Sequence, residues 1–403
     1  MKHYDVVIAG GAMVGATLAL ALDKLGGDDL SVAVIEPYPV EKSHPGFDAR
    51  AIALSYGSVQ ILDSFSLWQE LQPFVTPIKN IHVSDRGHVG MAEFSAAHQG
   101  VDALGYVVEL ADVGQLYHAR LAASGVDFKC PDSVVNIERT QDTNLITLAS
   151  GEEISCRLFV VADGTQSRCC EKLGLTAREY DFGQVAVIAN IVTESGHNNQ
   201  AYERFTEFGP LALLPMSEQR MSLVWCMSPE QAEELSLLPE EAFLSRLQDG
   251  FGWRLGRILQ VGERITYPLK LTMRDKIISH RVSVVGNAAQ TLHPVAGQGF
   301  NLGIRDVAAL AELLTEDKQS ETGCGVSHAK DVGNYSFLNQ YQKSRVHDRS
   351  ATVDLTYTLV RVFSNNQCPF VVTRNLGLMA VDTSTSLASP FLLRTMGLVE
   401  RSL

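Results

Sequence analysis

The pattern of apolar positions near the N-terminus predicts a strand, a helix and a second strand. Apolar residues run from Tyr4 to Ala9 and again from Ser31 to Ile35. Between these runs, apolar residues recur at helical spacing from Ala16 to Leu25, after a short glycine-rich segment. Two strands joined through a helix form a βαβ unit, so this segment predicts the start of a parallel sheet.

A second glycine-rich passage from strand to helix lies far from the first. The apolar strand Val282–Val285 leads through the glycine-rich residues 286–300 into a helix from Asn301 to Leu314. That helix has an apolar stripe formed by Leu302, Val307, Leu310, Leu313 and Leu314. Backbone amides and the dipole at a helix start favour a negatively charged group. Two such loops in one chain suggest a long cofactor that is held at both ends.

The remaining segments predict a second sheet and a helical end. Residues 77–99 and 181–274 contain short apolar runs that are typical of strands in a mostly antiparallel sheet. Residues 318–335 are polar and contain glycine, so we expect an exposed connection, and from Tyr335 onward the pattern is helical. The fold class is therefore α/β, or α+β overall. Its expected parts are a discontinuous Rossmann-like cofactor domain (1–76, 100–180 and 275–334), a substrate-binding sheet domain (77–99 and 181–274) and a C-terminal helical region (335–403).

Charge and composition exclude several classes of protein. The 403 residues carry a formal net charge of −13, which argues against nucleic acid as the main partner. Seven scattered cysteines without CxxC spacing indicate neither a disulfide framework nor a zinc site, and they fit a reducing cytoplasm. No apolar run reaches the roughly 18 residues of a membrane span. The mixed apolar and basic segment Pro390–Arg401 leaves two alternatives: packing on the protein's own body, or resting on the inner face of a membrane.

The first glycine-rich segment carries a dinucleotide-binding fingerprint. Gly10, Gly11 and Gly15 lie between strand and helix, and Glu36 ends the next strand about 20 positions later, where an acidic residue binds a ribose. Ala12 stands where the second glycine of the fingerprint is usual. Its methyl group narrows the approach of a pyrophosphate without blocking it.

Two further motifs make the similarity to a known family specific. Arg50 lies in the segment Asp48–Ser55, and Asp163-Gly164 follow the apolar residues 158–162. With the two glycine-rich segments, these motifs resemble the FAD motifs of the single-component FAD-dependent aromatic hydroxylases, which have the p-hydroxybenzoate hydroxylase-like fold. Four blocks resemble the ubiquinone-biosynthesis branch of that family: His44–Asp48, Val83–His88, Phe205–Met216 and Arg374–Met379.

The resemblance implies which residues bind FAD. For the pyrophosphate it implies Gly10, Gly11, Ala12, Met13 and Gly15. It implies that Glu36 binds the adenosine ribose and that Arg50 lies near the flavin ring and the ribityl chain. Asp163 and Gly164 are expected near the pyrophosphate, in a motif that is also linked to the nicotinamide nucleotide. The arginine that usually follows this last motif is replaced by Cys170.

At the flavin end, the resemblance implies that Gly286 and Asn287 lie near the ribityl hydroxyls. Asn287 replaces the aspartate of the wider family and can still accept a hydrogen bond through its amide oxygen. Gln290 replaces a common histidine. The expected residues around the isoalloxazine are Pro294, Gly297 and Gly299, with the backbone amides of Gly299, Phe300 and Asn301 at its pyrimidine edge.

The implied chemistry is hydroxylation of a phenol ring. In this family, NADPH or NADH reduces FAD, O2 forms a C4a-hydroperoxyflavin, and its distal oxygen passes to the ring. The implied substrate is a prenylated phenol, with 2-octaprenyl-6-methoxyphenol as the best match. Association with other ubiquinone-biosynthesis enzymes or with another copy of the chain is left open, as is the position of the ring carbon.

Candidate catalytic residues are few. His293 and its neighbour Pro294 are the best candidates, since His293 is the titratable residue inside the flavin loop and could relay a phenol proton. The alternative is a structural histidine. Arg204 could polarise a substrate oxygen, or it could be a solvated surface arginine. Two alternative functions also remain: a hydroxylase for another quinone precursor or a small phenol, and a FAD-fold accessory component without hydroxylase activity.

Overall fold

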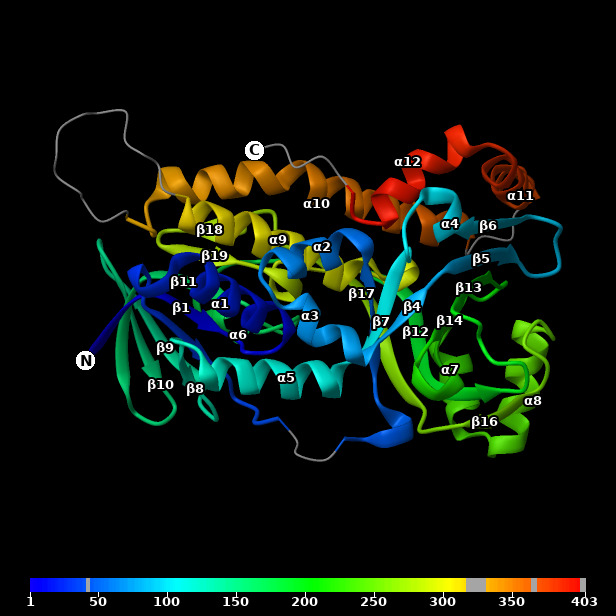
Figure 1. Ribbon diagram of the computed structural model, residues 1–403, viewed down its shortest axis with the longest axis horizontal. Coiled ribbons are helices and arrows are strands. Elements are labelled where there is room, and N and C mark those ends of the chain that lie inside the picture. The colour runs from blue at the N-terminus through cyan, green and yellow to red at the C-terminus, as the bar shows by residue number, and fades with distance from the viewer. Residues whose placement is uncertain (41–43, 317–330, 364–367, 399–403) are drawn as a thin grey trace.

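Three sheets organise the residues that the computed structural model describes, which are 1–40, 44–316, 331–363 and 368–398 (Figure 1). The mixture of helices and sheets confirms the predicted fold class. Residues 318–330 of the predicted exposed connection lie outside the described residues.

Parallel strands form the centre of the first sheet, as the apolar runs near the N-terminus predict. The order is β18-β19-β11-β1-β2-β8, and β1 pairs in parallel with both β11 and β2. Its strands are β1 (Lys2–Ala9), β2 (Val32–Ile35), β8 (Asp127–Lys129), β11 (Glu153–Val161), β18 (Ile278–Ser279) and β19 (Val282–Val284), with the hairpin β9 (Val134–Arg139) and β10 (Asn144–Leu148) attached to β11. Their side chains form the largest core with those of α1 (Met13–Gly26), α5 (Leu110–Ala123) and α9 (Gln298–Thr315).

Two glycines allow α1 to start close to the sheet. Gly10 has φ of +102°, and a Cβ there would collide with the carbonyl of Ala162. A Cβ at Gly15 would collide with the carbonyl of Gly10. The turn between β1 and α1 is therefore closed to other residues at these positions.

The second sheet has nine strands, in the order β20-β17-β12-β15-β14-β13-β5-β6 with β16 on β12. Their bounds are β5 (Asn80–Asp85), β6 (Met91–Ser95), β12 (Arg178–Thr193), β13 (Gln200–Phe205), β14 (Pro210–Pro215), β15 (Arg220–Met227), β16 (Ile258–Val261), β17 (Ile265–Met273) and β20 (Gln290–Thr291). Helices α7 (Pro229–Leu237) and α8 (Glu240–Phe251) pack on one face. The small third sheet contains β3 (Ala51–Ser55), β4 (Val75–Ile78) and β7 (Gly105–Glu109).

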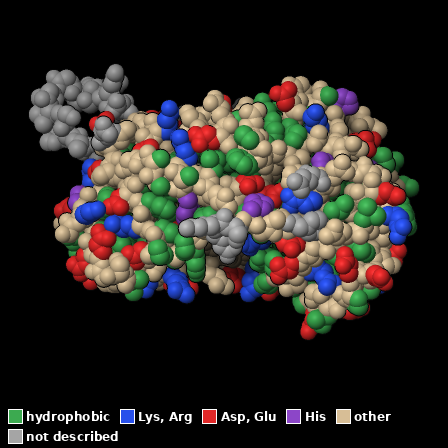
Figure 2. Space-filling model, turned by 60° about the horizontal axis from the view of Figure 1, so that its bottom comes forward, with side chains coloured by type: hydrophobic (Ala, Val, Ile, Leu, Met, Phe, Trp, Pro, Cys, Tyr) green, Lys and Arg blue, Asp and Glu red, His purple; other side chains and the backbone are tan. Residues whose placement is uncertain are grey.

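Short helices and turns complete the chain between these sheets. They are η1 (Gly27–Asp29), η2 (Gly46–Asp48), α2 (Tyr56–Ser64), α3 (Trp68–Leu71), η3 (Gln72–Phe74), α4 (Ala96–Gln99), α6 (Arg168–Lys172), η4 (Ser217–Gln219), η5 (Gly286–Ala288) and η6 (Val295–Gly297). Acidic and basic side chains are interspersed on the face shown in Figure 2, with small groups of apolar side chains between them.

The C-terminal region is helical, as the sequence pattern predicts. It consists of α10 (Tyr335–Phe363), α11 (Cys368–Thr383) and α12 (Thr385–Thr395). In Figure 1, α10 runs along the top of the molecule from the first sheet toward the second. Among the described helices, none alone is long and apolar enough to cross a membrane, although parts of α11 and α12 together pass that test as a bent pair.

A buried network of charged side chains joins α9 to α10. Asp306 of α9 is fully buried, and its carboxylate accepts from Arg345 Nε at 2.8 Å and from Gln290 Nε2 at 2.7 Å. Arg345 also donates to Asp348 at 2.7 Å, and Asp348 accepts from Arg305 at 2.8 Å. Burial alone would lower the pKa of Arg345, but the carboxylates of Asp306 and Asp348 outweigh it and raise that pKa.

Arg349 extends this network to the second sheet. Its Nε donates to Gln290 Oε1 at 2.6 Å, and its Nη2 donates to the carbonyl of Arg274 at 3.0 Å. Gln290 therefore uses both ends of its amide, donating to Asp306 and accepting from Arg349. These contacts give a physical role to the glutamine that replaces the histidine of the wider family.

We expect Arg345→Met to destabilise the protein by about 3–5 kcal/mol, because it leaves the carboxylate of Asp306 buried without its ion pair. Urea unfolding would measure the loss. The matched control is Arg361→Met in the same helix, where the arginine is exposed and the expected change is within about 0.5 kcal/mol. Equal effects of the two variants would contradict the importance of the network.

Candidate functional site

The two glycine-rich loops lie side by side in the structure. Val14 of α1 lies against both Gly286 and Gly303: a Cβ at Gly286 would be 2.9 Å from Val14 Cγ1, and one at Gly303 would be 3.1 Å from Val14 Cγ2. The starts of α1 and α9 therefore border a common region, although more than half of the chain separates them. This arrangement is what one cofactor held at both ends requires.

Both helix starts are suited to a negatively charged group. Ala12 precedes α1 and Gly297 precedes α9, and neither position provides a side-chain cap. Neither helix has an acidic residue in its first turn. Their first backbone amides thus point outward with the positive end of the helix dipole. Ala12 is exposed, so its methyl group does not crowd the protein itself.

Glu36 is held at the edge of the first loop. One carboxylate oxygen accepts from the amide of Gly11 at 2.6 Å, and the other accepts from the amide of Tyr38 at 3.0 Å. Each oxygen keeps a further lone pair for a hydroxyl donor. The carboxylate therefore fits the ribose position that the sequence predicts.

The Asp163-Gly164 turn joins the same region. Asp163 Oδ2 accepts from the amide of Cys169 at 3.0 Å, while its Oδ1 is buried without a hydrogen-bond partner among the described atoms. Thr165, one residue after the turn, accepts from Thr291 at 3.1 Å, and Thr291 also donates to the carbonyl of Asn287. An unpaired buried carboxylate oxygen fits a hydroxyl donor from a bound molecule.

Arg50 reaches from the cofactor side to the second sheet. Its side chain is exposed, and Nη1 donates to the hydroxyl of Tyr267 on β17 at 2.9 Å. The guanidinium therefore lies at an open boundary between the sheets. A cation at this place can balance negative charge on a bound cofactor.

The loop before α9, residues 286–297, and the first turn of that helix are shaped by polar contacts. Asn301 accepts from the amide of Ser55 at 2.8 Å and donates to the carbonyls of Ala53 and Gly297. Gly297 has φ of +60°, which favours glycine. Pro294, Gly299 and Phe300 are half-buried, Gly286 is buried, and Asn287 is exposed. A Cβ at Gly299 would meet open space.

His293 is buried in this loop and has both ring nitrogens engaged. Nδ1 accepts from the amide of Val295 at 3.2 Å, so Nε2 carries the proton and donates to Gln184 Oε1 at 3.2 Å. Burial lowers the pKa of His293 to about 4, which keeps the ring neutral at physiological pH. These contacts favour the structural alternative over a proton relay.

Successive residues along each strand of the second sheet point to opposite faces of the sheet. The outer face packs on α7 and α8 and contains a single buried cluster with Val187, Leu211, Leu213, Leu223 and Trp225. Leu211, Leu213 and Trp225 therefore belong to a core, and Pro215 points to the same face as Leu211 and Leu213. Phe205 lies on the opposite face, in a different cluster.

That opposite face, which we call the inner face, borders open space beside the cofactor motifs. Some of its residues are only half-buried: Ile81, Val83, Ile188, Glu203, Ala212, Leu214 and Val224. From the same face, Asn190 donates to the carbonyl of Ala49 at 2.7 Å and Gln184 contacts His293. The inner face is thus largely apolar and adjoins both Arg50 and the loop before α9.

Two inner-face residues were not recognised from the sequence. Glu203 lies in the row Glu203–Ala212–Val224, and Cys226 follows two residues after Val224 on β15. The signal for Glu203 was present in the sequence, because it is a charged residue between Ala201 and Phe205 in a strand. Arg204, by contrast, points to the other face, where its Nε donates to the carbonyl of Gly250 at 3.1 Å. The suggested contact of Arg204 with a substrate oxygen does not fit this position.

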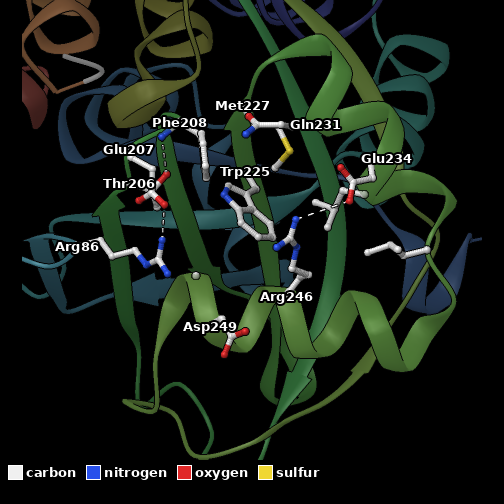
Figure 3. Close-up of a pocket in the computed structure, with 13 residues that line it drawn as sticks. Arg86, Thr206, Glu207, Phe208, Trp225, Met227, Gln231, Glu234, Arg246 and Asp249 are labelled. Carbon is white, nitrogen blue, oxygen red and sulfur yellow. Dashed lines mark hydrogen bonds and ion pairs between the residues drawn. The ribbon is translucent and has the colours of Figure 1, made fainter. Parts of the chain in front are cut away.

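A separate cavity of about 240 Å³ lies on the outer face (Figure 3). Trp225 lies in it, and the ion pairs Arg86–Glu207 and Arg246–Glu234 border it. None of the cofactor motif residues lines this cavity. It is therefore distinct from the open space at the inner face.

Comparison with known proteins agrees with this geometry. A family model described as FAD binding domain matches residues 3–323. The chain belongs to this family. It is similar to ubiquinone hydroxylase UbiL of Rhodospirillum rubrum (35% identity, covering 98% of this chain and 90% of that protein) and to 3-demethoxyubiquinol 3-hydroxylase of Escherichia coli (31%, covering 98% of each).

Solved structures of FAD-dependent hydroxylases share the fold. The p-nitrophenol 4-monooxygenase PnpA of Pseudomonas putida has a TM-score of 0.76 at 18% identity, covering 98% of this chain and 99% of that one. HpxO of Klebsiella pneumoniae, in complex with FAD and uric acid, also has a TM-score of 0.76 at 18% identity, covering 98% and 96%. The protein is a FAD-dependent aromatic hydroxylase, a class that uses NAD(P)H and O2.

We expect Gly299→Val to remove FAD from an otherwise folded protein, because its side chain would occupy the open space in front of α9. The affinity should fall at least about 100-fold, or about 2.7 kcal/mol. Titration of the apoprotein with FAD, followed by flavin fluorescence, would measure it. Gly377→Val is the matched control, since Gly377 is also a helical glycine with open space at Cβ. Normal FAD binding by Gly299→Val would show that the start of α9 does not contact the cofactor.

Proposed function

We propose that this hydroxylase acts on the ring of a polyprenylated phenol in ubiquinone biosynthesis, with 2-octaprenyl-6-methoxyphenol as its substrate. Similarity along almost the whole chain to enzymes named for ubiquinone hydroxylation carries the proposal. The inner face supports it, because a half-buried apolar surface beside the cofactor motifs suits an aromatic ring with an apolar tail.

The residues that would hold FAD follow the sequence prediction. The amides from Gly10 to Gly15 would bind the pyrophosphate, and Glu36 would bind the adenosine ribose. Asp163 would lie near the pyrophosphate. On the other side, Asn287 would meet the ribityl hydroxyls, and Arg50 would lie near the flavin ring. The amides from Gly299 to Asn301 would lie near the pyrimidine edge, where the helix dipole would stabilise negative charge. When bound and reduced by NAD(P)H, FAD supplies the activation of O2.

The loop and the sheet provide positioning and exclusion of water. His293 holds the turn that begins at Pro294, through its contact with Val295 and its bond to Gln184 on the second sheet. These contacts fix the distance between cofactor loop and inner face. A phenol held there meets the oxidant in a dry setting, which favours hydroxylation over release of hydrogen peroxide.

Anaerobic mixing with NADPH or NADH tests the proposal. We expect the yellow flavin to bleach, and the bleaching to accelerate when the prenylated phenol is present. After air is admitted, mass spectrometry should detect the phenol with one added oxygen atom. If the flavin is reduced but hydrogen peroxide is the only product, the enzyme's substrate would be another phenol or quinone precursor. Absence of bleaching with every phenol would favour the accessory FAD-fold component.

An exposed apolar surface suits contact with the membrane that contains such a substrate. Val372, Leu376 and Met379 lie at helical spacing on α11 and are 52%, 61% and 45% exposed. Val89 and Met91 lie beside them, because the amide of Gly90 donates to Asn375 of α11 at 2.6 Å. We refer to these five side chains as the α11 patch. They would rest among the lipid headgroups at the inner face of the membrane.

We expect the double variant Val372→Glu/Leu376→Glu to bind phospholipid vesicles at least about 10-fold more weakly, because two apolar side chains lose their burial. Cosedimentation with vesicles would measure this change. Leu237→Glu is the control, since Leu237 is 78% exposed on α7. Equal binding by the two variants would rule out the α11 patch as the contact.

A further inference from the structure

Glu203 is a carboxyl group in an otherwise apolar part of the inner face. It lies on β13 between Val83 of β5 and Ala212 of β14, with Val224 and Cys226 in the next strand. Its Oε1 is buried and has no hydrogen-bond partner among the described atoms. The residue as a whole is nevertheless half-buried, so some of its atoms border the open space.

Among the described residues, no lysine or arginine offsets the effect of burial on Glu203. The end of α10 and the loop before α9 contribute Val360, Phe363 and Val295 to this side of the sheet. On β5, Asp85 points to the same face as Val83, and it is paired with the cation Arg374 at 2.7 Å. On β15, burial raises the pKa of the Cys226 thiol well above its ordinary value, and the charge of Glu203 raises it further.

Burial in these surroundings raises the pKa of Glu203 to about 7. A carboxyl group without a partner is costly in such a place, and an apolar residue would stabilise the sheet more. A carboxylate whose pKa is moved toward neutral pH, and which faces a substrate space, has the properties of a general base. The unpaired oxygen has lone pairs that no described protein group uses, so it can accept a hydrogen bond.

We propose that Glu203 is the base that accepts the phenol proton of the bound substrate; this inference rests on the proposed function. The O–H bond of the phenol breaks, the proton passes to a carboxylate oxygen of Glu203, and the electron pair stays on the phenol oxygen. The phenolate donates more electron density to its ring carbons, so the ring attacks an electrophilic oxygen more readily. The site therefore selects aromatic rings that carry a free hydroxyl group.

The test compares Glu203→Gln with the wild-type holoenzyme, using 2-prenyl-6-methoxyphenol as a short-tailed probe. We expect the variant to keep FAD and its anaerobic reduction by NAD(P)H, but to form product at least about 100-fold more slowly and release hydrogen peroxide instead. In the wild type, the hydroxylation rate should rise with pH through about 7, as Glu203 ionises. That rise should be absent in the variant, and Glu203→Asp should recover part of the rate.

Glu179→Gln is the matched control, because Glu179 is an exposed carboxylate on β12 of the same sheet. It should keep the wild-type rate and pH profile. Wild-type hydroxylation and an unchanged pH profile in Glu203→Gln would overturn the proposal.

A second measurement decides the question even if Glu203→Gln does not fold. Ultraviolet difference spectra should show the phenolate form of the probe when it binds to oxidised wild-type enzyme at pH 8, and the methyl ether of the probe should not be hydroxylated. A neutral bound phenol at that pH would overturn the role of Glu203. Failure of the proposed function is distinguishable, because then NAD(P)H would not bleach the flavin of the wild-type enzyme or no phenol would be hydroxylated.

Discussion

The carboxylate of Asp306 is fully buried, and the arrangement of the cofactor side depends on the side chains that pair with it. An unpaired carboxylate in this position would be strongly destabilising. Arg345 pairs with it from α10, and Gln290 donates to it from β20. Because Arg349 also binds Gln290 and the carbonyl of Arg274, one network orients α10, the loop before α9 and an edge of the second sheet together. The same side chains thus contribute both to the stability of the fold and to the geometry of the site.

The two sheets divide the chemistry between them. The first sheet places uncapped helix starts around a common region, and these suit the negative parts of a dinucleotide. The second sheet contributes little charge to its inner face. This contrast separates the anionic cofactor from the apolar substrate surface, and Arg50 and Tyr267 connect the two at their boundary.

Local patterns in the sequence were sufficient for the elements around the cofactor. Strand β1, helix α1 and helix α9 follow directly from apolar spacing and glycine positions, because a buried parallel strand and an amphipathic helix each leave a clear period. The roles of the two faces of the second sheet were harder to predict from the sequence. Leu211 and Leu213 line the core whereas Ala212 and Leu214 line the open space, and both faces are apolar, so alternation alone does not say which is which. The buried network could not be predicted either, since Asp306 and Arg345 are brought together by helix packing and not by a local motif.

The contact of Val14 with Gly286 and Gly303 has a consequence for the order of events during synthesis. Residues 10–15 leave the ribosome early, but the opposite wall of their cofactor site is translated only after most of the chain. Arg345 and Arg349, which hold that wall through Asp306 and Gln290, come later still. The nascent N-terminal βαβ unit therefore lacks the opposite wall of the predicted cofactor site until residues 286–303 have been translated.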